Sequence, residues 1–214
     1  MGRKARIWYE GAMYHIINRG NSRQNIFIDP ADRVVFLDKL RGLVMEHGLR
    51  VHAYCLMTNH YHLVIETGKR HIGDTMRSLN TYYSKQYHIK YGTSGHLFQG
   101  RYRSVLVEKD AYLLELSRYV HLNPVGASLV KLPEHYPWSS MKVYIGEGSG
   151  SSLVYRDTVL GYFNQDSRAA QESYRRFVHA KLADNSGSLE KLVTYDDILG
   201  TESFVSEIRA LYSV

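Results

Sequence analysis

The chain has 214 residues, of which 44% are hydrophobic, enough for one compact domain with a core and a smaller appendage. Its formal net charge of +6 is typical of a solvated surface and also of a protein that binds a polyanion such as nucleic acid. The single cysteine, Cys55, excludes a disulfide framework or a cysteine-rich zinc module, and no apolar run approaches membrane-spanning length. We therefore expect a protein of the reducing cytoplasm that does not span a membrane.

The first half of the chain alternates between strand and helix patterns. Residues 13–20 are typical of a short strand that runs into a turn, and residues 29–48 have the apolar spacing of a helix. Two further strands, 51–57 and 60–66, are separated by only two residues. Such a short link requires an antiparallel hairpin, and Asn59 tolerates the positive φ that these turns need.

A second helix fits residues 74–91, and a further strand fits 104–109. Asp110 is a good N-cap for a third helix over 111–123, which Pro124 is expected to end. This element order predicts an α+β fold, with a ferredoxin-like antiparallel sheet and helices packed on one face.

A Gly/Ser-rich link at 145–152 is the clearest boundary in the chain. It predicts a first domain over 1–145 and a mainly helical C-terminal extension over 146–214. The extension carries no chemical motif, so we place the function in the first domain.

Two histidines lie two residues apart in the strand over 60–66. Because strand side chains alternate, His60 and His62 share one face, while Tyr61, Leu63 and Ile65 form an apolar row on the other. Two imidazoles at this spacing can ligate one divalent cation. The alternative is a pair of partly exposed polar residues without a ligand.

Two ligands are too few for a useful metal site, and the third helix offers another. Tyr119 and Asn123 are four apart and share a helix face, whereas His121 points away from it. The geometry thus favours Asn123 over His121 as a ligand beside Tyr119. Two imidazoles and an amide oxygen suit Mg²⁺ or Mn²⁺, with water or phosphate completing the shell.

Several segments together resemble the REP-associated tyrosine transposases, within the HUH class of single-tyrosine, insertion-sequence-type transposases. The resemblance runs in order over roughly residues 10–145. It is carried by YHIINRGNSRQNIF (14–27), YCLMTNHYHLVIE (54–66), GHLFQGRYRS (95–104), RYVHLNPVGASLV (118–130) and YPWSS (136–140).

This resemblance implies a role for each residue that matches a family motif. His60 and His62 correspond to the HUH pair, Tyr119 to the nucleophile and Asn123 to the amide that helps to hold the metal. It also implies cleavage and rejoining of single-stranded DNA beside REP-like palindromic hairpins, through a 5′-phosphotyrosine intermediate. A monomer is favoured, with a dimer as the alternative.

Two polar clusters are candidates for DNA contacts, because both mix cations with amide or aromatic groups. They are Asn18, Arg19 and Arg23 in the first turn, and Gln99, Arg101, Tyr102 and Arg103 in the loop before the fourth strand. His15 is expected to be a core histidine. Two rival functions stay open, a hairpin-DNA-binding protein without catalysis and a metal-dependent phosphohydrolase.

Overall fold

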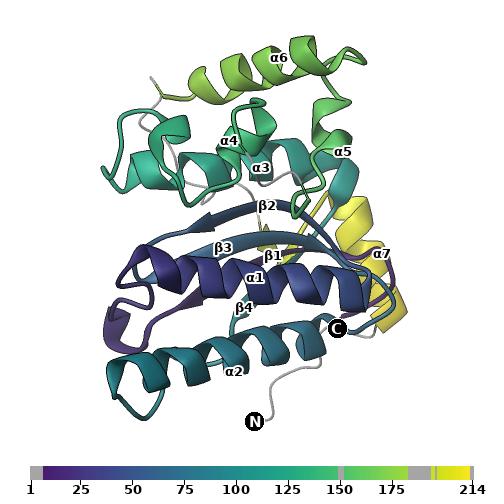
Figure 1. Cartoon of the computed structure of the whole chain (residues 1–214). Helices are drawn as coiled ribbons and strands as arrows, with labels where there is room; N and C mark the ends of the chain where they lie inside the picture. The colour runs from purple at the N-terminus through teal and green to yellow at the C-terminus, as the bar shows by residue number, and fades with distance from the viewer. Residues whose placement is uncertain (1–6, 149–151, 183–193, 196, 213–214) are drawn as a thin grey trace.

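The computed structural model describes residues 7–148, 152–182, 194–195 and 197–212, and an antiparallel sheet lies at its centre (Figure 1). Its four main strands are β1 (Met13–Arg19), β2 (Arg50–Leu56), β3 (His60–Glu66) and β4 (Arg103–Val107). These strands lie in the order β2-β3-β1-β4, and every neighbouring pair is antiparallel. The predicted α+β class and the ferredoxin-like sheet are confirmed.

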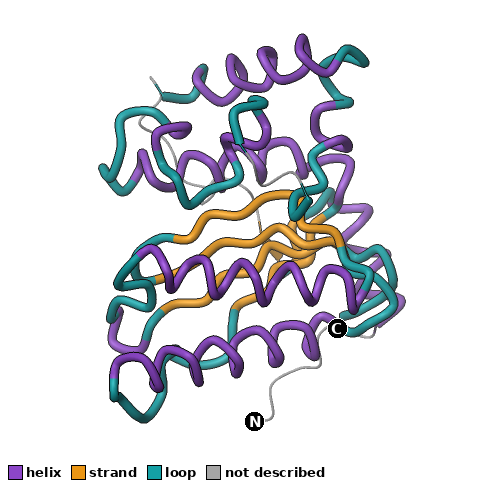
Figure 2. The backbone as a smooth tube through the Cα atoms, in the orientation of Figure 1, coloured by secondary structure: helices purple, strands orange, loops and turns teal. Residues whose placement is uncertain are grey.

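The helices cover both faces of this sheet. α1 (Pro30–His47) and α2 (Ile72–Tyr91) pack on one face, whereas α3 (Lys109–Gly126) lies on the other (Figures 1 and 2). The expectation of helices on one face therefore needs correction for α3. The reason is that the residues of β3 from Tyr61 onward are buried on both faces, so each face requires a cover.

α3 also differs from the sequence prediction at both ends. It begins at Lys109, so Asp110 lies in its first turn, and Pro124 lies inside the helix without ending it. Proline removes a single backbone N–H, and the helix continues because the N–H of Ala127 donates to the carbonyl of Asn123 at 3.0 Å. α3 is therefore continuous through the segment that carries the candidate nucleophile. The remaining predicted strands and helices agree with the structure within two residues at each end.

The described residues after 145 are mainly helical, as predicted, but they also extend the sheet. β6 (Ile198–Leu199) pairs in parallel with β4, and β5 (Thr194–Tyr195) pairs with β6. The domain boundary at residue 145 stays a prediction, and residues 149–151 of the predicted link lie outside the described residues. The other helices and helical turns are η1 (Asn21–Arg23), η2 (Pro133–His135), α4 (Met141–Tyr144), α5 (Asp157–Leu160), α6 (Ser167–His179) and α7 (Glu202–Tyr212). Within the ranges that the structure describes, no helix has both the length and the apolarity needed to cross a membrane.

A buried polar network joins α6 to α3, and α6 forms the outermost layer on that side of the sheet (Figure 1). The hydroxyl of Tyr174 lies 2.7 Å from Nδ1 of His121 and donates to Oγ of Ser117 at 3.0 Å. The other ring nitrogen of His121, Nε2, lies 2.7 Å from Oγ of Ser140. All four side chains are buried, so the network fixes α3 against α6 and against the turn that begins α4.

Replacing Tyr174 with phenylalanine is expected to lower the free energy of unfolding by about 1–3 kcal/mol, because it leaves Nδ1 of a buried imidazole without its partner. Chemical denaturation measures the change. Tyr162→Phe is the matched control, since Tyr162 is an exposed tyrosine of the same extension. Equal midpoints for the two variants would show that the network contributes nothing to stability.

An ionic cluster ties β2, β3 and α3 together at the end of β3. Glu66 is 8% exposed and accepts hydrogen bonds from His52 Nε2 at 2.8 Å, Lys109 Nζ at 2.8 Å and Arg50 Nη1 at 3.1 Å. The hydrogen bond from His52, together with Lys109, outweighs desolvation and lowers the pKa of Glu66 from 4.5 to about 2. The carboxylate is therefore ionised in the folded protein at all but strongly acidic pH.

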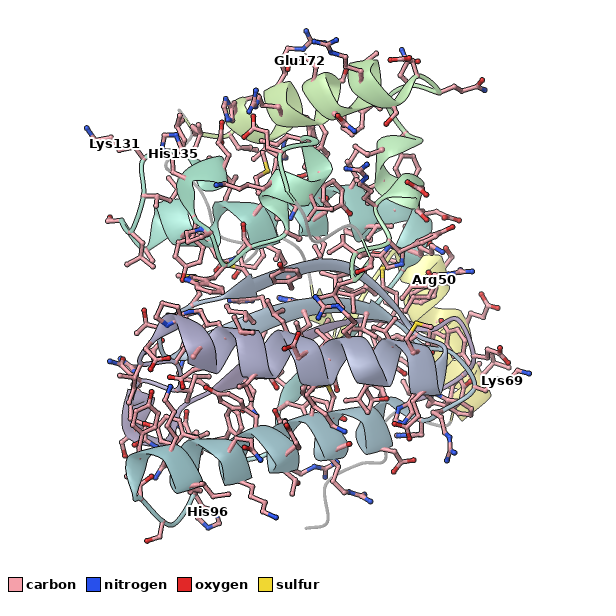
Figure 3. All side chains as sticks on the ribbon, in the orientation of Figure 1. Arg50, Lys69, His96, Lys131, His135 and Glu172 are labelled. Carbon is pink, nitrogen blue, oxygen red and sulfur yellow. The ribbon has the colours of Figure 1, made fainter. Side chains whose placement is uncertain are left out.

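Glu66→Gln is expected to lower the free energy of unfolding by about 1–2 kcal/mol at pH 7, less than the full pKa shift because Arg50 and Lys109 are partly exposed to solvent. Since the folded pKa is depressed, this contribution is present above pH 4.5 and is lost as pH falls toward 2. Urea unfolding of both proteins between pH 7 and 3 should show the difference shrinking below pH 4.5. The control is Glu172→Gln, whose side chain points outward from α6 (Figure 3), and a constant difference across this range would contradict the assignment.

Candidate active site

β3 places the two candidate histidine ligands on the same face of the sheet. Tyr61, between them, is fully buried on the opposite face, where its ring lies 4.8 Å from that of Phe36 on α1. This contact anchors the strand and turns both imidazoles toward α3. The ring centroids of His60 and His62 are 5.1 Å apart, so the alternation expected from the sequence is realised.

Burial keeps both imidazoles uncharged. His62 is only 3% exposed, and desolvation, followed by the effects of His15, His60 and Arg19, holds its pKa well below the usual value. Desolvation and the nearby Arg19 also lower the pKa of His60 to about 4. At neutral pH each ring therefore carries one N–H and one nitrogen lone pair, which is the form that binds metals.

Tyr119 of α3 approaches these imidazoles from the other side of the site. Its ring centroid lies 5.7 Å from that of His62 and 5.9 Å from that of His15, edge-on in both cases. His121, two residues further along α3, instead faces the buried network with Tyr174. The helical period therefore separates Tyr119 from His121 as the sequence predicts.

Asn123 lies one helical turn beyond Tyr119 and is partly buried. Its side-chain Nδ2 donates to the backbone carbonyl of Tyr119 at 2.8 Å. With the amide nitrogen held by the helix, the oxygen is the atom that would serve as a ligand.

The donor atoms at this site fit a divalent cation. Nε2 of His62 is buried without a hydrogen-bond partner, which is costly unless something else occupies it. Nδ1 of His60 lies 2.7 Å from Oδ1 of Asn59, so its Nε2 is the ring nitrogen left for a ligand role. Among the described residues, no cluster of three or more His, Cys, Asp or Glu side chains is arranged to hold a metal. The two candidate ligands that the structure brings together on one face are His60 and His62, and their imidazole nitrogens are of the kind that binds a divalent cation. Asn123 as a third ligand stays a prediction.

The two candidate DNA-contact clusters meet on one surface. Gly20 forms an antiparallel bridge with Phe98, and the N–H of Gln99 donates to the carbonyl of Arg19 at 2.9 Å. These bonds hold the loop before β4 against the end of β1. The members of the clusters that are exposed are Arg19, Arg23, Gln99, Arg101 and Arg103.

The other two members are buried, which the sequence did not anticipate. Asn18 is 5% exposed and its Oδ1 accepts from the N–H of Arg19 at 3.0 Å, while Tyr102 is 7% exposed. Their side chains have little surface to offer DNA. The candidate contact set therefore narrows to the five exposed residues.

Two of these arginines lie on the same face of the sheet as the imidazoles because of the strand register, Arg19 beside His60 and Arg103 one strand further away. Arg19 of β1 is paired with His60, and Ile17 is paired with His62 on one side and with Arg103 on the other. Burial is the main reason for the lowered pKa values of His15, His60 and His62; the charge of Arg19 adds to the effect on His60 and His62, and that of Arg103 to the effect on His15. The site therefore lies in a positive field that favours an anionic substrate.

His15 is the residue that the sequence interpretation underestimated. It is 5% exposed, as expected of a core histidine, but its ring also contacts those of His62 and Tyr119. A signal was present in the sequence, because His15 and Arg19 alternate onto the same face of their strand. What only the structure shows is the register of β1 against β3, which brings His15 beside His62.

Comparison with known proteins identifies the family of this chain. Residues 9–123, more than half of the chain, match the family model described as "Transposase IS200 like". A REP-associated tyrosine transposase, solved bound to a REP hairpin, is 16% identical and covers 69% of this chain and 87% of its own, with a TM-score of 0.57. At that identity the similarity shows a shared fold. A candidate transposase from Deinococcus radiodurans R1 is 20% identical over 56% of this chain and 95% of its own, with a TM-score of 0.40. None of the curated proteins matches the chain.

Proposed function

This chain belongs to the IS200-like transposase family, and from that premise we propose that it cleaves and rejoins single-stranded DNA beside hairpins, with Tyr119 as the nucleophile. The observation that carries the proposal is the approach of the Tyr119 ring to 5.7 Å from the ring of His62. The hairpin as substrate is supported by the structural relative that was solved with a REP hairpin.

In the proposed reaction, the phenolic oxygen of Tyr119 attacks a backbone phosphorus atom. The bond from phosphorus to the 3′ oxygen breaks, and the proton lost by the phenol is balanced by the one that the leaving 3′ oxygen gains. The 5′ phosphate remains on the tyrosine as a phosphodiester, so a later 3′ hydroxyl can rejoin the strand without an external energy source.

The surrounding residues support this chemistry. A divalent cation, Mg²⁺ or Mn²⁺, held by His60, His62 and Asn123 would neutralise charge on the phosphate oxygens. Arg19 adds positive charge beside the same face of the sheet, whereas the charge of Arg103 is partly balanced by its ion pair with Asp197 at 3.1 Å. The approach of Tyr119 to His62 within the same chain supports a monomer, which we propose.

The charge distribution favours the first domain as the DNA-binding part. Residues 1–145 contain 20 Lys or Arg against 11 Asp or Glu, whereas residues 146–214 contain 7 against 10. The basic excess therefore lies with the candidate site and its two exposed clusters. This distribution argues against the C-terminal extension as the main electrostatic contact with DNA.

The test is a cleavage assay with a pool of hairpin oligonucleotides that have randomised stems and flanks and a different fluorophore at each end. With Mg²⁺ or Mn²⁺, a denaturation-resistant protein band should carry the 3′-end label only, and mass spectrometry should place the linked peptide at Tyr119. Two short free fragments with no protein band would indicate a phosphohydrolase. A shifted but uncut pool would indicate a hairpin-binding protein without catalysis.

Replacing Arg101 with alanine is expected to weaken hairpin binding and to reduce the slope of log K against log salt by roughly one unit, because one phosphate contact is lost. Fluorescence anisotropy at several salt concentrations measures both quantities. Arg77→Ala is the matched control, since Arg77 is an exposed arginine on α2, across the sheet from the site. Equal slopes for the two variants would remove Arg101 from the proposed DNA surface.

A further inference from the structure

His15 makes a contact that the proposed reaction does not itself explain. Its Nε2 lies 3.0 Å from Nδ1 of His62, and the two rings are nearly parallel, with centroids 5.3 Å apart. His15 is held in β1, which is paired with β3 on one side and with β4 on the other. Its position relative to His62 is therefore set by the central strands of the sheet.

The contact restricts where His62 can carry its hydrogen. A neutral imidazole has one N–H, on either Nδ1 or Nε2. A hydrogen on Nε2 would be a buried donor without an acceptor, and it would also block that atom from binding a cation. A hydrogen on Nδ1 is donated to His15 instead, and it leaves the lone pair on Nε2.

His60 shows the same arrangement with a different acceptor. Its Nδ1 lies 2.7 Å from Oδ1 of Asn59. The orientation of that amide is fixed, because its Nδ2 donates to the carbonyl of Arg23 at 3.1 Å. Nδ1 of His60 thus faces an acceptor, and its Nε2 is left with the lone pair.

We propose that His15 is a positioning residue, which accepts the Nδ1–H of His62 and so holds Nε2 of His62 ready to bind a divalent cation beside Tyr119. Acceptors of this kind orient histidine ligands and set their tautomer. The inference rests on the proposed function for the identity of the ligands, but the tautomer itself is a property of the metal-free protein.

A direct ligand role for His15 fits the structure less well. The nitrogen nearest to His62, Nε2, is occupied by the contact with that ring. In the part of the chain that the structure describes, its imidazole also does not form a metal-holding cluster with the other two histidines. The geometry therefore assigns it to support His62.

The first test is ¹⁵N NMR of the imidazoles in the metal-free protein. His62 should be in the tautomer with hydrogen on Nδ1 in the wild type and in His15→Gln, whose side-chain oxygen can still accept. It should lose that preference in His15→Phe. Because no DNA or metal is involved, the result is independent of whether a covalent adduct forms. A wild-type His62 with hydrogen on Nε2 would overturn the inference.

The second test is a Mn²⁺ titration followed by electron paramagnetic resonance. His15→Phe should bind Mn²⁺ about 10–100-fold more weakly than the wild type, and His15→Gln should recover most of that loss. The control is His47→Phe, because His47 is a buried histidine on α1 whose Nδ1 lies 2.8 Å from Oγ1 of Thr75, away from the site.

Wild-type affinity in His15→Phe with an unchanged His62 tautomer would refute the positioning role. If His15→Phe does not fold, the wild-type tautomer and the His15→Gln affinity decide the question. Neither the NMR measurement nor the Mn²⁺ titration requires a covalent adduct. This inference can therefore be tested even if the cleavage assay fails.

Discussion

Replacing Tyr119 with phenylalanine is expected to reduce the covalent protein–DNA product by at least about 1,000-fold, because the substitution removes the oxygen that forms the phosphotyrosine bond. The phenylalanine ring keeps the edge-on packing of position 119 against His15 and His62. Hairpin affinity and Mn²⁺ affinity should therefore stay within about threefold of the wild type. The labelled-hairpin assay measures the adduct, and anisotropy measures binding.

The control for this variant is Tyr82→Phe. Tyr82 is an exposed tyrosine on α2, a helix that packs on the opposite face of the sheet, so its substitution should leave the adduct unchanged. An adduct of normal yield in Tyr119→Phe would assign the nucleophile elsewhere and would end the proposal for this residue. Cleavage that persists without an adduct would favour the hydrolase alternative.

His62→Ala is expected to have the second-largest effect, with Mn²⁺ binding and DNA cleavage each falling at least about 100-fold. His62 presents the buried Nε2 that lacks a hydrogen-bond partner, and its ring contacts that of Tyr119, with the two centroids 5.7 Å apart. Hairpin binding should change little, because this substitution does not alter the exposed arginines that are proposed to contact DNA. Paramagnetic titration and the cleavage assay measure the two losses.

His47→Ala serves as the matched control for His62→Ala. It also removes a buried histidine with one hydrogen-bond partner, but it does so on α1. The two variants are expected to be destabilised to a similar degree, as measured by circular dichroism and denaturation. A loss of Mn²⁺ binding in His62→Ala alone is then not explained by a loss of stability. Full Mn²⁺ affinity in His62→Ala would show that the imidazole of His62 is not a metal ligand.

The local features of this protein follow from short-range patterns that can be read in the chain. Strand alternation places His60 and His62 opposite Tyr61, and the helical period separates Tyr119 from His121. These arguments need only the geometry of one strand or one helix, so they hold whatever packs against it. The antiparallel hairpin after β2 is of the same kind, because its link is too short for any other connection.

Other features depend on which elements meet, and periodicity carries no such information. Nothing in the pattern of residues 13–20 indicates that β1 lies between β3 and β4, yet that pairing brings His15 to His62 and sets Arg19 and Arg103 on the same face of the sheet as the imidazoles. The burial of Asn18 and Tyr102 depends in the same way on the loop before β4 folding back onto β1.

The sequence alone was sufficient for the strand that carries the histidine pair, the helix that carries Tyr119 and the resemblance to a transposase family. The placement of α3 on the second face of the sheet, the pairing of β6 with β4 and the role of His15 became visible in the folded chain. The physical reason is the sequence separation of the residues that determine each feature. Side-chain direction is set by backbone torsions over a few residues, whereas contacts between residues 47 or more positions apart are selected by how the buried surfaces of the whole chain fit together.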